Sequence, residues 1–407
     1  MRARLYAAIL IAAMATAACA PQRTMPAASS DSSPHWLFVW TASADTSRKA
    51  AFLAVLDLRD GSPTQGKVVS VLPAGAGAEG THHTEHSLQP DGLLFADDFG
   101  LGRTSIFDLN DGANPKLHAS FTTAGPFGWP HSYARLPGGN RLITYQWQAA
   151  KFNSPPGGLA EVRTDGTVVR WAGAKTAAAA DLEITPYSLE LVPALDRVVS
   201  TTTSMIDDTG VHVQIWRLSD LTLLNTVKIP GGAPHGSHAG DTVQRHLFPG
   251  EPRVLRDGKT VMLATFTCGL YTVTGIETDT PRVTPVYAFE GKNCAVPVVM
   301  GKYWLQTVPD AHAVVVLDIS NPLAPREVSR VDMGTIGPHW LASDASGRHL
   351  VTNSGSNRDS NLYLLTFNPS TGKIARDARM PVLDLSVVSV PGVGNVRGAP
   401  HGAVFSR

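Results

Sequence analysis

One sequence motif recurs along the chain, and such a repeat restricts the fold more than any other feature of the sequence. Each copy has a proline and polar residues, a short apolar strand, a turn with glycine or aspartate, and a second apolar strand. His131 precedes Gly139 by the same number of residues as His339 precedes Gly347. Further copies begin near residues 81, 186, 250 and 295. An alternating strand follows most copies, so the repeat predicts four-stranded units joined by turns.

The seventh copy is divided between the two ends of the chain. Residues 399–405 form a first strand with nothing after it, whereas residues 36–40, 52–57 and 67–72 are later strands without a first strand. Pairing them completes a blade and removes an exposed sheet edge. Residues 35–407 then give about 53 residues per blade. We therefore predict an all-β, seven-bladed β-propeller with four-stranded blades, closed by pairing the C-terminal strand with the N-terminal strands.

The first residues are typical of an export signal. Arg2 and Arg4 precede an apolar run over residues 5–15, which is too short to span a bilayer. The small residues before Cys19 resemble a bacterial lipoprotein signal, in which Cys19 carries the lipid, although Thr16 stands where that signal usually has leucine. The alternative is ordinary cleavage after residue 20.

These features predict the organisation and location of the chain. Residues 1–19 are the expected signal peptide, residues 20–34 a flexible tether rich in Ala, Ser and Pro, and residues 35–407 one propeller domain. The expected location is the periplasm, with a membrane contact only through the lipid anchor.

Charge and cysteine content exclude several classes of protein. Lys+Arg and Asp+Glu are both 34, so the net charge is zero and a nucleic-acid partner is not expected. If Cys19 carries lipid, Cys268 and Cys294 form an even pair in an oxidising compartment, which favours a disulfide. The alternative is a pair of buried free thiols.

The 14 histidines are not spread evenly. His131, His339 and His401 each follow a proline at the start of a first strand, and the first complete blade carries His82, His83 and His86 at about the same place. First strands surround the channel of a propeller, so these side chains should converge on its axis. The alternative for each single copy is a turn in which the imidazole bonds to the backbone.

Converging imidazoles predict a metal site, because neutral imidazole suits copper, zinc, iron or nickel. Tyr187, Glu251 and Trp340 lie at or beside the equivalent positions and could orient the ligands. His235 and His238 lie in a glycine-rich segment that either folds over the channel or forms an exposed loop. The acidic pair Asp97-Asp98 is interpreted as part of a turn.

The chain resembles the selenium-binding protein and methanethiol oxidase family of seven-bladed propellers. The residues that carry the resemblance are His82-His83, Pro130-His131-Ser132 and the stretch from Glu251 to Leu341, which includes Asp318-Ile319-Ser320-Asn321-Pro322. The resemblance implies a copper-dependent oxidase that converts methanethiol, oxygen and water into formaldehyde, hydrogen sulfide and hydrogen peroxide. Selenium-linked members have a cysteine shortly after the histidine pair, but residues 84–88 contain none.

Two functions follow as hypotheses. The first is a periplasmic, copper-dependent oxidoreductase that acts on a small sulfur compound as substrate. The second is a non-catalytic propeller lipoprotein that binds a metal or a partner, since the fold alone does not determine function. The sequence leaves the oligomeric state open.

Overall fold

The structure is a computed structural model, and the residues that it describes are 34–45, 47–74, 80–175, 182–207, 209–231, 245–356 and 358–407. The predicted signal peptide, Cys19, His235 and His238 lie outside these residues. Within the described part of the chain, no helix is both long enough and apolar enough to cross a membrane.

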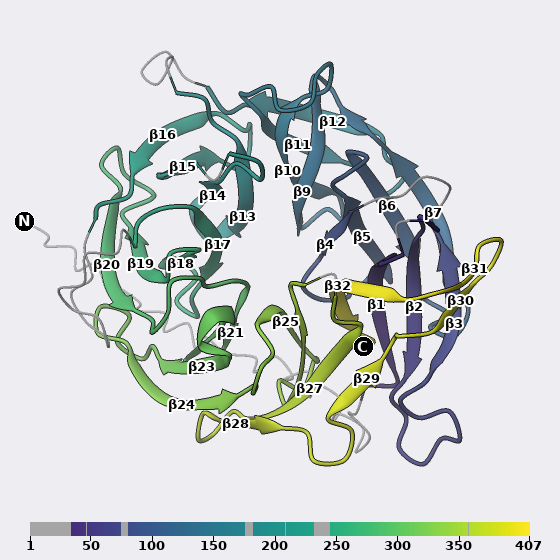
Figure 1. Ribbon diagram of the computed structural model, residues 1–407. Coiled ribbons are helices and arrows are strands. Elements are labelled where there is room, and N and C mark those ends of the chain that lie inside the picture. Colours follow the sequence, from purple (N-terminus) through teal and green to yellow (C-terminus); the bar gives the residue numbers. More distant parts are fainter. Residues whose placement is uncertain are drawn as a thin grey trace, which may run out of the picture. The chain divides into compact units, whose positions relative to one another are not determined.

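The strands form seven sheets arranged around a central axis, as Figure 1 shows. We number these sheets as blades in chain order and give the strands of each blade from the axis outward. Blade 1 contains β4 (Thr81–Thr84), β5 (Leu93–Asp98), β6 (Arg103–Asp108) and β7 (Lys116–Phe121). Blade 2 contains β9 (Phe127–Arg135), β10 (Arg141–Gln148), β11 (Gly158–Val162) and β12 (Val168–Gly173), with β8 (Thr123–Ala124) beside β9. Blade 3 contains β13 (Pro186–Val192), β14 (Arg197–Thr202), β15 (His212–Arg217) and β16 (Leu223–Lys228).

The remaining blades follow the same plan. Blade 4 contains β17 (Pro249–Val254), β18 (Val261–Thr265), β19 (Gly269–Thr274) and β20 (Arg282–Ala288). Blade 5 contains β21 (Pro297–Met300), β22 (Tyr303–Val308), β23 (Ala313–Asp318) and β24 (Arg326–Asp332). Blade 6 contains β25 (Pro338–Ser343), β26 (His349–Ser354), β27 (Asn361–Asn368) and β28 (Lys373–Arg376), and β29 (Val382–Asp384) pairs with β27. Blade 7 contains β32 (Gly398–Phe405), β1 (Trp36–Ser43), β2 (Ala51–Asp57) and β3 (Val68–Pro73).

A few short elements lie outside this plan. The strands β30 (Val388–Val390) and β31 (Gly394–Val396) form a separate hairpin. The 3-10 helices η2 (Pro193–Leu195) and η3 (Pro309–Ala311) each form one turn. The chain described by the structure is thus built from strands and short turns, as the repeat predicts.

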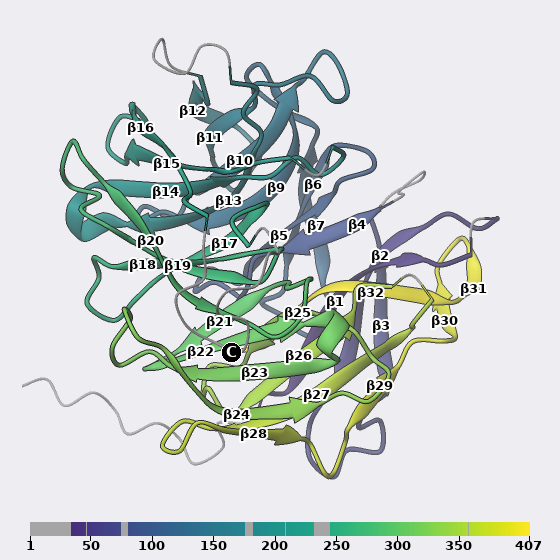
Figure 2. The same cartoon turned by 60° about the vertical axis from the view of Figure 1, so that its left-hand side comes forward.

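Blade 7 closes the ring by joining the two ends of the chain. Strand β32 pairs antiparallel with β1, from Leu37 opposite Phe405 to Ser43 opposite Gly398. Figures 1 and 2 both show β32 in yellow beside β1 in purple. The predicted seven-bladed fold and its terminal closure are therefore confirmed.

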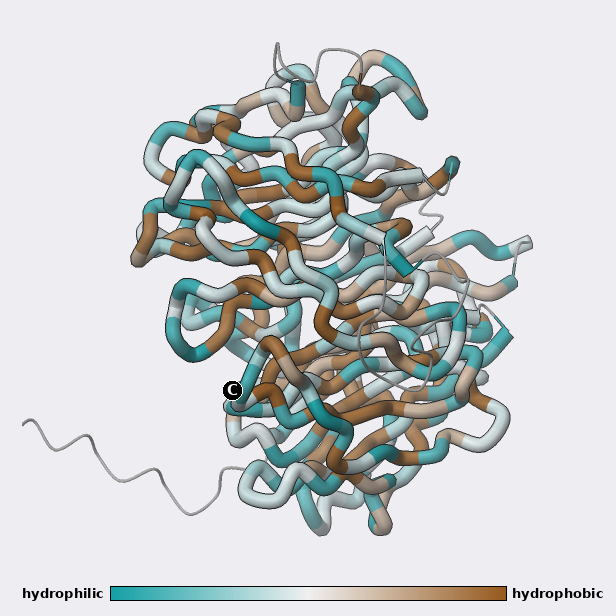
Figure 3. Tube along the Cα trace, turned by 90° about the vertical axis from the view of Figure 1, so that its left-hand side faces the viewer, coloured by the Kyte–Doolittle hydropathy of each residue, from teal (hydrophilic) through white to brown (hydrophobic). Residues whose placement is uncertain are grey.

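Apolar side chains fill the spaces between neighbouring blades. Along β1, Leu37 and Val39 pack toward blade 6, whereas Phe38 and Trp40 pack toward blade 1. This division follows from the alternation of side chains along a strand, which gives each central strand two buried faces. In Figure 3, hydrophobic segments run along the strands and hydrophilic residues concentrate at the outer turns. This packing between neighbouring blades fixes their positions around the axis.

A disulfide connects two neighbouring blades. Cys268 lies between β18 and β19 of blade 4, and Cys294 lies just before β21 of blade 5. Their sulfur atoms are 2.11 Å apart, and both residues are buried. The pair that the sequence favoured is thus joined in the structure.

Removing this disulfide is expected to lower stability by about 3 kcal/mol, because the bond closes a loop of 26 residues in the unfolded chain. The change is Cys268→Ser with Cys294→Ser, and the measurement is the midpoint of thermal unfolding with and without reductant. Reductant should lower the midpoint of the natural chain and leave that of the double variant unchanged. Equal midpoints for both proteins without reductant would contradict the prediction.

Candidate metal centre

The inner strands share a β-bulge that directs side chains toward the axis. In blades 1 to 4 and 6, two residues of the inner strand stand opposite one residue of the second strand. A bulge of this kind bends the strand and changes the direction of its side chains. The doubled pairs are His82 and His83, His131 and Ser132, Tyr187 and Ser188, Gly250 and Glu251, and His339 and Trp340. In blade 7 the extra residue at the register shift is His401.

In blades 1, 2, 3 and 6, a polar side chain opposite the bulge accepts a hydrogen bond from it. The backbone N–H of His83 donates to Asp97 Oδ1 at 2.7 Å, and that of Ser132 donates to Thr144 Oγ1 at 3.0 Å. Equivalent bonds join Ser188 to Thr201 at 3.2 Å and Trp340 to Asn353 at 3.1 Å. The same hydrogen-bonded bulge therefore recurs in these four blades.

The same polar side chains also connect one blade to the next. Thr144 Oγ1 donates to the carbonyl oxygen of Tyr187 at 2.7 Å, and Asn353 Nδ2 donates to that of His401 at 2.7 Å. The first bond is buried and the second is partly buried, and losing a hydrogen-bond partner away from water is costly. They fix the inner strands relative to one another and so fix the side chains on the axis.

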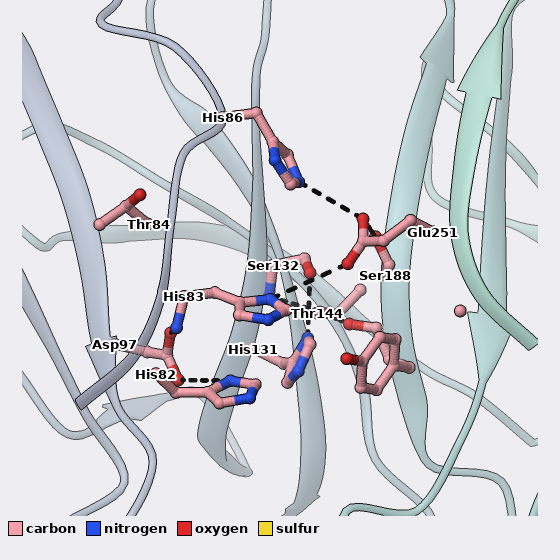
Figure 4. A network of polar contacts seen from close by, with 12 residues as sticks. His82, His83, Thr84, His86, Asp97, His131, Ser132, Thr144, Ser188 and Glu251 are labelled. Atoms are coloured by element: carbon pink, nitrogen blue, oxygen red, sulfur yellow. Dashed lines mark hydrogen bonds and ion pairs between the residues drawn. The ribbon is translucent and has the colours of Figure 1, made fainter. Parts of the chain in front are cut away.

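Five imidazoles from four blades converge at this place. The rings of His82 and His83 stack with centroids 3.9 Å apart, and His131 lies 4.8 Å from His82 and 4.6 Å from His83. His401 lies 4.5 Å from His82, and its Nε2 is 3.1 Å from Nε2 of His339. Figure 4 shows the three rings of His82, His83 and His131 beside one another.

Burial keeps these imidazoles neutral. It lowers the pKa of His131 and of His339 to about 4. Burial and the neighbouring imidazoles lower the pKa of His82, His83 and His401 well below the ordinary value. At neutral pH each ring therefore has a lone pair available for a metal ion.

Several ring nitrogens have no partner within the described protein. Nδ1 of His82, both ring nitrogens of His83 and Nε2 of His131 are buried and make no hydrogen bond with a described residue. Buried polar atoms are normally paired, so such a group of unpaired nitrogens requires an explanation. Ligand atoms of His82, His83 and His401 lie within 4.8 Å of one another. The residues present fit a transition metal held by imidazole.

Two buried carboxylates flank the cluster. Asp97 Oδ2 lies 3.7 Å from Nδ1 of His82, and Glu251 Oε1 lies 3.9 Å from Nδ1 of His83. Burial raises the pKa of Asp97 well above its ordinary value. Burial alone would also raise the pKa of Glu251, but the hydrogen bond with His86 and the charge of Arg253 lower it. Carboxylates beside ring nitrogens are the usual orienting partners of metal-binding histidines.

Asp97 is a functional candidate that the sequence interpretation missed. It was interpreted as part of a turn with Asp98, but both residues end strand β5 and are fully buried. The interpretation as a turn is therefore wrong. An alignment of the second strands would have placed Asp97 at the same register as Thr144, Thr201 and Asn353.

His86 lies with Glu251 and not with the five converging rings. Its Nε2 is 3.4 Å from Glu251 Oε2 and 3.0 Å from a nitrogen of Arg253, and its ring stacks on Trp340 at 4.7 Å. Figure 4 shows the contact with Glu251 on the side away from His82. The structure thus places five of the six predicted ligands together and gives His86 a different set of contacts.

Tyr187 and Trp340 pack against the cluster. The ring centroid of Tyr187 lies 3.8 Å from that of His131, and the Trp340 ring lies 5.1 Å from His83. Both side chains are buried, and the Trp340 indole N–H donates to the carbonyl oxygen of Ala403 at 2.8 Å. They limit the motion of the imidazoles and exclude water from these sides.

The turn that follows the histidine pair is held by a buried ion pair. Arg141 Nε donates to Glu85 Oε1 at 2.7 Å, and both side chains are almost fully buried. Arg141 also contacts the partly exposed carboxylate of Asp91 at 2.9 Å. Since Glu85 directly follows β4, this pair joins the histidine strand of blade 1 to blade 2.

Comparison with known proteins supports the resemblance found in the sequence. No family model matches the chain. A methanethiol oxidase of Ruegeria pomeroyi is 31% identical over 115 residues, which is 27% of this chain and 26% of that protein. The matched segment therefore spans about a quarter of the length of this relative, and the match confirms the resemblance over that segment.

Solved structures show the fold. A hypothetical selenium-binding protein from Sulfolobus tokodaii has a TM-score of 0.71 at 15% identity, covering 92% of this chain and 94% of that chain. A periplasmic gluconolactonase of Pseudomonas aeruginosa has a TM-score of 0.63 at 14% identity, covering 92% of this chain and 99% of that chain. At these identities the similarity establishes only the propeller fold. The chemistry has to be inferred from the residues of the site.

Proposed function

We propose that this chain is an exported, copper-dependent oxidoreductase that acts on a small sulfur compound and is a remote relative of methanethiol oxidases. The observation that carries the proposal is the group of five neutral imidazoles on the propeller axis, three of which, His82, His83 and His131, have buried ring nitrogens without a described partner. The match to a methanethiol oxidase supports the choice of substrate class. We also propose that the chain is exported and carries a lipid anchor at Cys19.

His82, His83, His131, His339 and His401 are the residues that would hold the copper. Bound copper supplies a redox centre through which electrons pass from the sulfur compound to oxygen. Imidazole suits copper, and the described ligands of this cluster are imidazoles, in contrast to the oxygen ligands that calcium or magnesium would prefer.

The surrounding residues orient the ligands. Asp97 faces Nδ1 of His82. A metal cation bound at Nε2 would favour a proton on Nδ1 and the ionised form of Asp97, against the burial that raises its pKa. Glu251 faces Nδ1 of His83 in the same way and is itself held by Ser188 Oγ, which donates at 2.6 Å. Ring orientation is thus set by groups that do not themselves bind the metal.

Replacing Asp97 with asparagine is expected to weaken copper binding about 10- to 100-fold, the usual cost of losing an orienting partner. Asparagine retains an oxygen for the His83 N–H but removes the carboxyl group that faces Nδ1 of His82. Copper affinity is measured by competition with a chelator.

The matched control for this substitution is Asp344→Asn. Asp344 is also a buried carboxylate beside an imidazole, with Oδ2 2.9 Å from Nδ1 of His349, but the pair lies outside the cluster. Its replacement should leave copper affinity unchanged. Similar losses of affinity in both variants would contradict an orienting role for Asp97.

The activity is tested on protein reconstituted with copper. The resemblance implies that methanethiol, oxygen and water are consumed in equal amounts and that hydrogen peroxide and hydrogen sulfide form. We expect oxygen uptake that depends on both copper and thiol. A copper-loaded protein that turns over no thiol in a panel would instead support a non-catalytic metal-binding propeller.

A further inference from the structure

A cavity of about 410 Å³ opens directly onto the imidazole cluster. Two of the five converging imidazoles, His82 and His339, form part of its wall. The other described residues that line it come from blades 3 and 4 and from the segment before blade 5: Tyr187, Thr203, Ser204, Met205, Phe248, Phe266, Thr267, Lys292 and Asn293. The cavity therefore leads from solvent to the candidate metal site.

The volume of this cavity is much greater than methanethiol requires. A water molecule occupies about 30 Å³ of liquid, so a thiol with two non-hydrogen atoms needs roughly twice that volume. Cavities of 300 to 1,000 Å³ are typical sites for ligands of roughly ten or more non-hydrogen atoms. The size of the cavity thus points to a larger thiol.

The wall combines apolar and polar surface. Tyr187 and Phe266 meet edge to face with ring centroids 5.4 Å apart, and Met205 and Phe248 extend this surface. The hydroxyls of Thr203 and Thr267 donate to the carbonyl oxygens of Pro249 and Leu247 at 2.9 and 3.0 Å. Because these hydroxyls are engaged by the backbone, an aromatic or aliphatic body can lie against the apolar part of the wall.

The rim carries a positive charge. The backbone N–H groups of Lys292 and Asn293 donate to the carboxylate of Asp310 at 2.7 and 3.1 Å, which fixes this segment at the entrance. Lys292 is exposed, and none of the described lining residues is acidic. An anionic group on the ligand would find the Lys292 cation at the rim, beside an Asp310 carboxylate that the two backbone N–H groups already engage.

We propose that this cavity binds an organic thiol with an apolar body and one anionic group, oriented with its sulfur toward His82 and His339 and its anion toward Lys292. The proposal rests on the proposed function and narrows its substrate to a class larger than methanethiol. The fit of the thiol's apolar body against the wall positions its sulfur atom. The charge of its anionic group determines which thiols bind best.

The test compares three thiols: methanethiol, (4-methylphenyl)methanethiol and 4-(mercaptomethyl)benzoate. Binding to the metal-free and copper-loaded chain is measured by calorimetry, so the readout does not depend on turnover. The two aromatic thiols should bind more tightly than methanethiol, and the benzoate should bind most tightly. Lys292→Gln should weaken the benzoate by up to about fivefold, as expected for an ion pair with an exposed lysine, while the neutral aromatic thiol provides the internal comparison.

Two further variants keep the result interpretable. Lys302→Gln removes an exposed lysine from the turn between β21 and β22, outside the cavity lining, and should not change the order of the three affinities. Met205→Trp fills the cavity and should weaken both aromatic thiols. The proposal is overturned if the aromatic thiols bind no better than methanethiol, or if Lys292→Gln and Lys302→Gln have equal effects on the benzoate. A chain that binds no copper would instead refute the proposed function.

Discussion

Replacing His83 with glutamine is expected to abolish stoichiometric copper binding. His83 is 1% exposed, both of its ring nitrogens lack a described partner, and its ring contacts those of His82 and His131. Loss of a ligand should exceed the roughly 10- to 100-fold effect of losing an orienting partner. Copper content after reconstitution and dialysis is the measurement, with circular dichroism as the check that the propeller is folded.

His349→Gln is the matched control for this variant. His349 also lies on a strand and faces a buried carboxylate, but it belongs to β26 and lies outside the converging group. Its replacement should leave copper content unchanged. A folded His83→Gln protein that retains a full complement of copper would contradict the assignment of His83 as a ligand.

Replacing Arg141 with methionine is expected to destabilise the protein by about 3 to 5 kcal/mol, because it leaves a buried carboxylate without its partner. Burial raises the pKa of Glu85 to about 7, and the charge and hydrogen bond of Arg141 oppose that rise. Without Arg141, Glu85 either takes up a proton or draws water into the space between blades 1 and 2. The free energy of unfolding in denaturant at pH 8 is the measurement.

Arg135→Met is the matched control for this buried pair. Arg135 contacts the same Asp91 carboxylate at 3.3 Å, but its side chain is 27% exposed. Its loss should cost no more than about 1 kcal/mol, as is usual for surface ion pairs. Glu85→Leu combined with Arg141→Met should recover most of the loss, and equal costs for Arg141→Met and Arg135→Met would refute the account.

The fold could be predicted from the sequence because each blade repeats the same sequence motif. The split seventh blade was readable since residues 399–405 lack later strands and residues 36–72 lack a first strand. Both observations follow because a strand inside a sheet needs a hydrogen-bonded neighbour on each of its two edges. The β-bulges were not predicted, because hydrophobic alternation does not show where one strand has an extra residue.

The site could be predicted in part. The Pro-His copies placed His131, His339 and His401 at one register, and that register lies at the bulge. Asp97 was missed because two adjacent acidic residues resemble a turn when burial is unknown. The contacts of His86 could not be read from the sequence, because it follows the end of β4 and no strand register fixes its direction.

Copper analysis of the purified chain tests the central claim most directly. The chain is reconstituted with copper(II), dialysed, and examined by elemental analysis and by electron paramagnetic resonance. We predict one copper per chain with hyperfine splitting from imidazole nitrogens, and loss of both in a protein with His339→Gln and His401→Gln. The absence of stoichiometric copper after reconstitution, or an unchanged spectrum in that double variant, would contradict a copper site on the propeller axis.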